Sequence, residues 1–182
     1  MMENSKQNFW KEVGSYIVMI AAVFVVVLFV NNFLLINARI PSSSMEDTIM
    51  MNDRIFGNRL SYHSEDPKRF DIVIFRYPDD PSTLFIKRII GMPGETLEIR
   101  GGKVYVDGSA EPLDDSFCRE EPLGDFGPFT VPEGCYFMMG DNRGSSFDSR
   151  YWGELNKDRF VGRAVAVWWP VKRAKVLHKL KK

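Results

Sequence analysis

The stretch TLFIKRIIGMPGETLEIRGGKVYV, residues 83–106, contains the clearest signs of the fold. Residues 83–90, 96–100 and 103–106 are short β-prone runs separated by turn-forming residues. Gly101 and Gly102 join the last two runs, and a tight hairpin is expected there because glycine tolerates the positive φ of a primed turn. Similar runs occur at 70–76, 135–139 and 160–169. The sequence therefore predicts a mainly β domain.

A long apolar segment precedes these runs. No charged residue occurs from Val13 to Ala38, and residues 16–30 read YIVMIAAVFVVVLFV. Apolar residues on every face are typical of a membrane helix. As a helix, residues 13–36 would reach roughly 36 Å, against a hydrocarbon core of about 30 Å. We therefore predict one N-terminal transmembrane helix at 13–36.

The flanks of this segment suggest its orientation and leave one alternative. Lys6 and Lys11 precede the span and favour a cytoplasmic N-terminus at residues 1–12, with an extracytoplasmic β-rich domain at 37–182. The alternative is a cleavable signal peptide. Its apolar region is normally about 7 to 15 residues and ends at a small-residue cleavage site, which residues 37–39 (NAR) match poorly.

Composition excludes several function classes. The 24 Lys and Arg balance the 24 Asp and Glu, so no overall positive field favours nucleic acid as a partner. Hydrophobic residues make up 45% of the chain, which is enough to bury a core. Cys118 and Cys135 have neither the spacing of a zinc site nor that of a disulfide-rich framework, although one bridge remains possible. We expect no metal and no cofactor.

Candidate nucleophiles and bases are few. A Ser/His/Asp triad would need His63 or His178, but His63 lies in a polar loop and His178 in a basic tail, and both are expected to be solvated. Neither cysteine has an obvious activating partner. A serine with a lysine base remains.

Three consecutive serines, Ser42, Ser43 and Ser44, directly follow the membrane segment. They could simply begin a helical turn, with Ser44 and Asp47 at capping-box spacing. In TLFIKRII, strand alternation gives Lys87 apolar neighbours, and desolvation there could lower its pKa from about 10.4 to the region of 7 or 8. The alternative is a lysine that extends to solvent from an edge strand.

A third segment, GDNRGSSFDSRYWG at residues 140–153, is dense in hydroxyls, turn formers and both charge signs. Alone it reads as an irregular loop held by Asp/Arg pairs. A polar loop after an apolar strand is also a common place for functional residues.

Together, and in this order, the segments resemble bacterial type I signal peptidases, the membrane-anchored serine/lysine endopeptidases that remove signal peptides from exported preproteins. The resemblance covers nearly the whole chain. Its motifs are the N-terminal anchor, IPSSSM (40–45), RFDIVIF (69–75), FIKRIIGMPGE (85–95) and GDNRGSSFDSRYWG. It implies a signal-peptidase-like β catalytic domain behind a single transmembrane helix, with Ser44 as nucleophile and Lys87 as general base. Ser42 would join the Ser44 N–H in the oxyanion hole, and Ser146 would orient Lys87.

The resemblance also implies supporting residues and partners. Arg88 with Asp141, and Asp148 with Arg150, would be structural charge pairs. Substrates would carry small residues one and three positions before the cleaved bond, and the residues implied to line their subsites are Ile40, Ile49, Ile55, Phe85 and Ile86. The implied partners are signal peptides of exported preproteins and a phospholipid membrane. The implied location is a bacterial cell membrane, crossed once, with the catalytic domain outside.

One position departs from the family pattern. The family often has proline where this chain has Asp47. The carboxylate could alter the turn behind the nucleophile, raise the pKa of Lys87 if it lies close, or cap the following turn. Lysine rather than histidine as base distinguishes the chain from archaeal and endoplasmic-reticulum relatives and indicates a bacterium.

Two other functions remain open from sequence. One is a non-catalytic, membrane-anchored β module that binds exported chains in an apolar groove, which would tolerate Ser44→Ala and Lys87→Ala. The other is a sortase-like cysteine transpeptidase, which would depend on Cys118 or Cys135.

Overall fold

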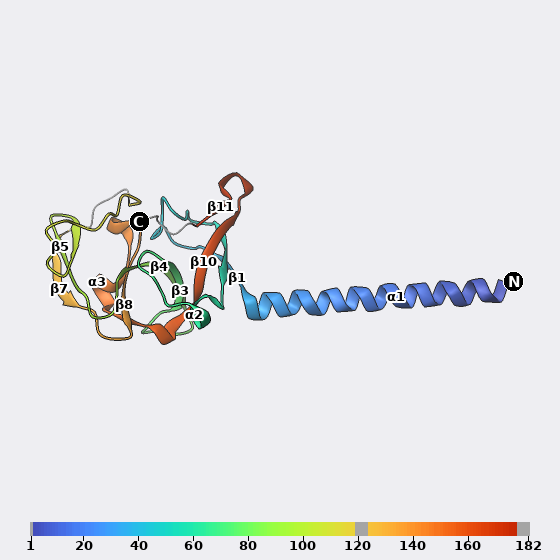
Figure 1. Cartoon of the computed structure of the whole chain (residues 1–182). Helices are drawn as coiled ribbons and strands as arrows, with labels where there is room; N and C mark the ends of the chain where they lie inside the picture. The colour runs from blue at the N-terminus through green and yellow to red at the C-terminus, as the bar shows by residue number, and fades with distance from the viewer. Residues whose placement is uncertain (1, 119–123, 178–182) are drawn as a thin grey trace. The chain divides into compact units, whose positions relative to one another are not determined.

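The computed structural model describes residues 2–118 and 124–177, with side chains from residue 11 onward. The chain forms two compact units, Met1–Leu35 and Ile36–Lys182, which are described separately (Figure 1). The first is helical, and the second contains most of the strands.

The helical unit consists of α1 (Met2–Phe29), which continues as the π-helical turn η1 (Val30–Leu34). Lys11–Leu34, 24 residues, is long and apolar enough to cross a bilayer. The helix ends slightly earlier than predicted, because Leu35 and Ile36 already belong to strand β1.

The second unit is built on an eight-stranded sheet in the order β1-β2-β10-β3-β4-β8-β9, with β11 also paired to β10. A smaller sheet has the order β6-β5-β7. The strands of the large sheet are β1 (Leu35–Arg39), β2 (Arg54–Asn58), β3 (Ile72–Arg76), β4 (Leu84–Gly91), β8 (Cys135–Met139), β9 (Leu155–Asn156), β10 (Phe160–Trp169) and β11 (Lys175–Val176). Those of the small sheet are β5 (Thr96–Arg100), β6 (Lys103–Val106) and β7 (Phe126–Thr130).

Short helical turns connect the strands. They are α2 (Ser61–Ser64), η2 (Arg143–Ser145), α3 (Ser149–Trp152), η3 (Lys157–Arg159) and η4 (Val171–Arg173). None is long enough to form a layer of its own, so the mainly β fold predicted from sequence is confirmed.

The predicted hairpin is confirmed. Strands β5 and β6 pair in antiparallel register with Arg100 opposite Lys103. Gly101 and Gly102 between them both have positive φ, 51° and 78°. This is the conformation that a two-residue primed turn needs.

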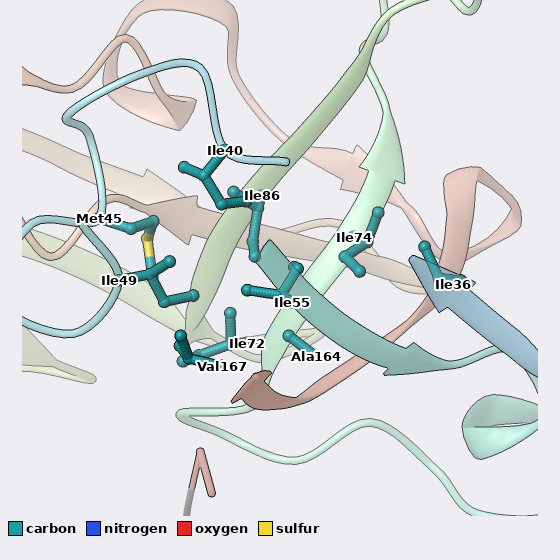
Figure 2. Packing of buried hydrophobic residues seen from close by; sticks show 10 residues of the cluster. All are labelled: Ile36, Ile40, Met45, Ile49, Ile55, Ile72, Ile74, Ile86, Ala164 and Val167. Carbon is teal, nitrogen blue, oxygen red and sulfur yellow. The ribbon is translucent and has the colours of Figure 1, made fainter. Parts of the chain in front are cut away.

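The core comprises several clusters of buried residues, and the one next to the nucleophile segment lies against the large sheet. This cluster joins the strands of that sheet to the segment after β1 and includes the buried residues Ile40, Met45, Ile49, Ile55 and Ile86 (Figure 2). Strand β4 lies between β3 and β8 and is buried from Ile86 to Gly91. A charged residue in this part of β4 therefore has little access to water, and its partners must come from the protein.

Candidate active site

Strand β4 places Lys87 in the interior. Its backbone lies opposite Val73 of β3, and its ammonium nitrogen lies 5.6 Å from the centre of the Phe85 ring. Lys87 is only 4% exposed. Apolar neighbours on a central strand thus remove most of the water that would otherwise stabilise its charge.

Ser44 belongs to the loop between β1 and β2. Backbone hydrogen bonds fold this loop; among them, Glu46 N–H donates to Ser43 O at 2.9 Å and Ile49 N–H donates to Met45 O at 2.7 Å. The side chains of Met45 and Ile49 are fully buried and pack together in the core (Figure 2). They anchor the turn and fix the position of Ser44 beside them.

These two elements bring serine and lysine together. Lys87 Nζ lies 2.5 Å from Ser44 Oγ, and both side chains are buried. Burial lowers the pKa of Lys87 to about 8, although the carboxylates of Asp148 and Asp141 oppose this shift. A lysine with this pKa is partly neutral near pH 8 and can accept the hydroxyl proton.

A cavity of about 290 Å³ opens beside the pair. Ser42 lines it, with its Oγ 3.4 Å from Ser44 Oγ. Because Ser42 is exposed, its hydroxyl is available to donate to an oxyanion formed at Ser44. The residues lining the cavity are Pro41, Ser42, Ser44, Thr83, Leu84, Phe85, Ile86, Lys87, Ser145 and Phe147.

The loop after β8 forms hydrogen bonds with the nucleophile segment. Asn142 N–H donates to Ser44 O at 3.1 Å, and Asn142 Nδ2 donates to Ser43 O at 3.2 Å. Ser146 is also buried, but its Oγ has no hydrogen-bond partner among the described residues. The expected bond from Ser146 to Lys87 is therefore not made in this structure.

Two charge pairs hold this loop. Arg88 donates to both oxygens of Asp141, at 2.8 and 2.6 Å, and both side chains are buried. Arg150 Nε donates to Asp148 Oδ1 at 2.8 Å, while Asp148 Oδ2 accepts from Gly140 N–H at 3.0 Å. The paired residues predicted from sequence are thus in contact, at the edge of the Ser44 and Lys87 site.

The sequence matches a family described as "Signal peptidase, peptidase S26" over residues 13–169. The chain belongs to this family. A probable signal peptidase I-2 from Synechocystis is 38% identical over 96% of this chain and 80% of its own length. A signal peptidase I from Leptolyngbya laminosa is 40% identical over 74% of this chain and 68% of its own. A crystal structure of a signal peptidase I from Enterococcus faecalis V583 covers 54% of this chain and 97% of its own, with 36% identity and a TM-score of 0.47.

The five residues expected to line substrate subsites in this signal peptidase separate into two groups. Phe85 and Ile86 line the cavity beside Ser44. Ile40, Ile49 and Ile55 are at most 3% exposed and lie in the core cluster behind it (Figure 2). In this structure the second group supports the cavity and does not line it.

At the position where signal peptidases often have proline, the backbone takes an unusual conformation. Asp47 has a φ of 75°, in the left-handed region, whereas proline is confined to a φ near −65°. Aspartate is one of the residues that adopts this region. The turn behind the nucleophile therefore differs from one that contains proline. The carboxylates that raise the pKa of Lys87 are Asp148 and Asp141.

The two cysteines of this signal peptidase are free thiols. Burial raises the pKa of Cys118 to about 12 and also raises that of Cys135. A nucleophilic cysteine needs the opposite shift. His63, the other candidate base described here, is exposed in α2. His178 lies outside the described residues.

Several residues at the site were not identified from the sequence, among them Asn142, Leu84 and Phe147. Asn142 binds the nucleophile segment, and Leu84 and Phe147 form an exposed apolar rim of the cavity. Phe147 offered one signal, since it is an aromatic residue within an otherwise polar loop. Leu84 offered none, because a leucine in a β-prone run normally packs in the core.

Proposed function

We propose that this protein removes signal peptides from exported preproteins, with Ser44 as nucleophile and Lys87 as general base. As a member of the signal peptidase family it is a serine endopeptidase. The observation that carries the assignment of roles is the contact between a buried, desolvated lysine and a serine hydroxyl at the wall of an open cavity.

The proposed reaction begins with neutral Lys87. Its Nζ takes the proton of Ser44 Oγ, and Oγ attacks the carbonyl carbon of the scissile peptide bond. Ser42 Oγ–H and the Ser44 N–H stabilise the resulting oxyanion. The Lys87 ammonium then protonates the leaving amine, which releases the mature protein and leaves an ester on Ser44. Lys87 next deprotonates a water molecule, which attacks the ester carbon. The Lys87 ammonium then returns this proton to Ser44 Oγ as the bond to the signal peptide breaks, which frees the signal peptide and restores neutral Lys87.

The cavity favours small apolar side chains next to the cleaved bond. Phe85 and Ile86 supply an apolar wall close to Ser44, and the cavity of about 290 Å³ lies at the lower limit of small-molecule sites. We therefore propose cleavage after small residues. Larger side chains would displace the carbonyl from Ser44 Oγ.

We propose that α1 anchors the enzyme in a bacterial cytoplasmic membrane with the catalytic unit on the outer face. The helix is of spanning length, and Ser44 follows its last π-helical residue, Leu34, by ten residues in the chain. Tethering enzyme and substrate to one membrane raises their effective concentration. Lys6 and Lys11 before the span support a cytoplasmic N-terminus.

The proposal is tested with the full-length protein in detergent and a preprotein that has small residues one and three positions before its cleavage site. Mass spectrometry of the product should give one new N-terminus at that site. Ser44→Ala, prepared in the same way, controls for contaminating proteases and should give none. Binding without cleavage would favour the non-catalytic module. Loss of cleavage only on replacement of Cys118 or Cys135 by alanine would favour a cysteine enzyme.

The rate of cleavage should fall steeply at acid pH. The base must be neutral, and with a pKa of about 8 Lys87 is half neutral at pH 8 and only about 1% neutral at pH 6. A plot of log kcat/KM against pH should therefore rise with a slope near one and bend at about pH 8. A flat profile down to pH 6 would contradict Lys87 as the base.

A further inference from the structure

The C-terminal segment, residues 171–177, contacts the loop that contains the nucleophile. It comprises η4 and β11, and β11 pairs with β10 through Val176 opposite Ala166 and Lys175 opposite Val167. Strand β10 in turn pairs with β2, which directly follows the loop. The pairing of these strands thus brings the segment to residues more than 100 positions earlier in the chain.

The first contact joins Arg173 to Asp53. Arg173 Nε and Nη2 both donate to Asp53 Oδ1, at 2.9 and 2.6 Å. The Asp53 side chain is 2% exposed, and its second oxygen, Oδ2, accepts from Met50 N–H at 2.9 Å. Both oxygens of a buried carboxylate are therefore satisfied, one by a cation from the C-terminal segment and one by the loop itself.

The backbone next to Asp53 holds the start of the nucleophile segment. Ile40 N–H donates to Asp53 O at 2.9 Å, and Asn52 N–H donates to Ile40 O at 2.8 Å. The buried side chain of Ile40 lies beside Ile86 in the core (Figure 2). Ser42 follows Ile40 by two residues. A displacement of Asp53 would therefore shift Ile40, and with it Ser42 and Ser44.

A second, weaker contact reaches the loop closer to the nucleophile. Lys175 Nζ donates to Asp47 O at 3.5 Å, three residues after Ser44. Both contacts thus fall after the serine in the chain, and the first also reaches the residues before it through the backbone bond between Ile40 and Asp53. Lys87, by contrast, is held by the pairing of β4 with β3 and β8, whereas β11 pairs with β10.

We infer that Arg173 is a positioning residue for catalysis: through Asp53 it fixes Ser42 and Ser44 relative to Lys87. This inference rests on the proposed function. A misplacement of about 1 Å at a reacting atom can cost about 100-fold in rate. Loss of the Arg173 contact should therefore reduce the rate of the chemical step and leave the apolar wall of the cavity, formed by Phe85 and Ile86, unchanged.

The test compares three variants of the full-length protein in detergent. Arg173→Gln should lower kcat about tenfold or more and leave KM within about twofold. Arg173→Lys keeps the charge with fewer donors and should restore part of kcat. Lys172→Gln removes the neighbouring exposed cation and should behave like the wild type. The plot of log kcat/KM against pH should bend near pH 8 in all three variants, because the surroundings of Lys87 are intact.

A merely structural role gives a different result. Arg173→Gln would then lower the unfolding temperature, while kcat per active site, counted with a covalent serine-directed probe, would equal that of the wild type. That outcome, or an equal loss of kcat in Lys172→Gln, would overturn the inference. Wild-type protein that releases no signal peptide would instead refute the proposed function.

A double-mutant cycle provides an independent measurement if Arg173→Gln folds poorly. Asp53→Asn combined with Arg173→Gln removes the buried charge together with its partner, so the pair should fold better than Arg173→Gln alone. If Arg173 acts through Asp53, the double variant should lose no more kcat than either single variant. Additive losses would show that Arg173 acts by another route.

Discussion

Replacement of Lys87 by methionine should abolish cleavage and at the same time stabilise the folded protein at neutral pH. Methionine has nearly the same length as lysine and fits the buried site, but it cannot accept the Ser44 proton. The expected fall in kcat is about 1000-fold or more, within the range that removal of a general base produces. Cleavage of the same preprotein, followed by mass spectrometry, measures it.

The stability effect follows from the shifted pKa. Lys87 has a pKa of about 8 in the folded protein against 10.5 for an ordinary lysine, so below pH 8 the fold must bury a charge. This difference corresponds to about 3 kcal/mol. Loss of the hydrogen bond to Ser44 offsets about 1 kcal/mol of the gain in Lys87→Met. The advantage should be complete below pH 8, decline as the pH rises from 8 to 10.5, and disappear above pH 10.5, where lysine becomes neutral in both the folded and the unfolded state.

Unfolding of the catalytic unit, followed by circular dichroism at pH 7 and pH 10.5, tests this dependence. Lys172→Met is the matched control, because it makes the same substitution at an exposed site in the same unit. Substantial cleavage by Lys87→Met, or lower stability than the wild type at pH 7, would contradict the assignment of Lys87 as a desolvated base.

Replacement of Gly140 by alanine should have the second large effect. A Cβ at this position would overlap Ser146 Oγ and Ser44 O, and would lie 2.6 Å from Ser146 Cβ. The glycine cannot easily move away, since its N–H donates to Asp148 and its carbonyl accepts from Arg143 Nε, each at 3.0 Å. We expect kcat/KM to fall about 100-fold. Overpacking should also reduce the free energy of unfolding by about 1 to 3 kcal/mol.

The same cleavage and unfolding measurements test Gly140→Ala. Gly14→Ala serves as control, because a Cβ on Gly14 in α1 meets no atom within 4 Å and alanine is the better helix former. If Gly140→Ala keeps activity within about threefold of the wild type, the close packing between the loop after β8 and Ser44 is not required for catalysis.

The strands that could be predicted from sequence are continuous β-prone runs bounded by turn-forming residues. Residues 96–100, 103–106, 135–139 and 160–169 were predicted with the bounds that the structure shows. The run at 70–76 begins too early, because Phe70 has a φ of 70° and β3 starts at Ile72. Strand β7, with the sequence FGPFT, was not predicted, since Gly127 and Pro128 weaken the β pattern. Proline is tolerated there because β7 is an edge strand.

Strands β1, β2, β9 and β11 also were not predicted. The sequences of β1 (LINAR) and β2 (RIFGN) contain Asn, Ala and Gly, which are uncommon in strands, and β9 and β11 are only two residues long. Short segments carry little periodic information of their own. Asp53 directly precedes β2 and Arg173 lies two residues before β11, and the pairing of both strands with β10 brings these residues together from positions 120 residues apart.

The sequence by itself determined the apolar helix, the mainly β class and the residue types of a serine and lysine pair, because these depend on local patterns and motifs along the chain. Only the tertiary structure decided that Lys87 Nζ meets Ser44 Oγ across 43 residues, that the lysine loses its water, and that Ile49 and Ile55 pack in the core while Leu84 and Phe147 line the cavity. The physical reason is that distance and desolvation depend on the pairing of distant strands and on the packing between them. Neither the distance nor the desolvation can be predicted from a local pattern of residues.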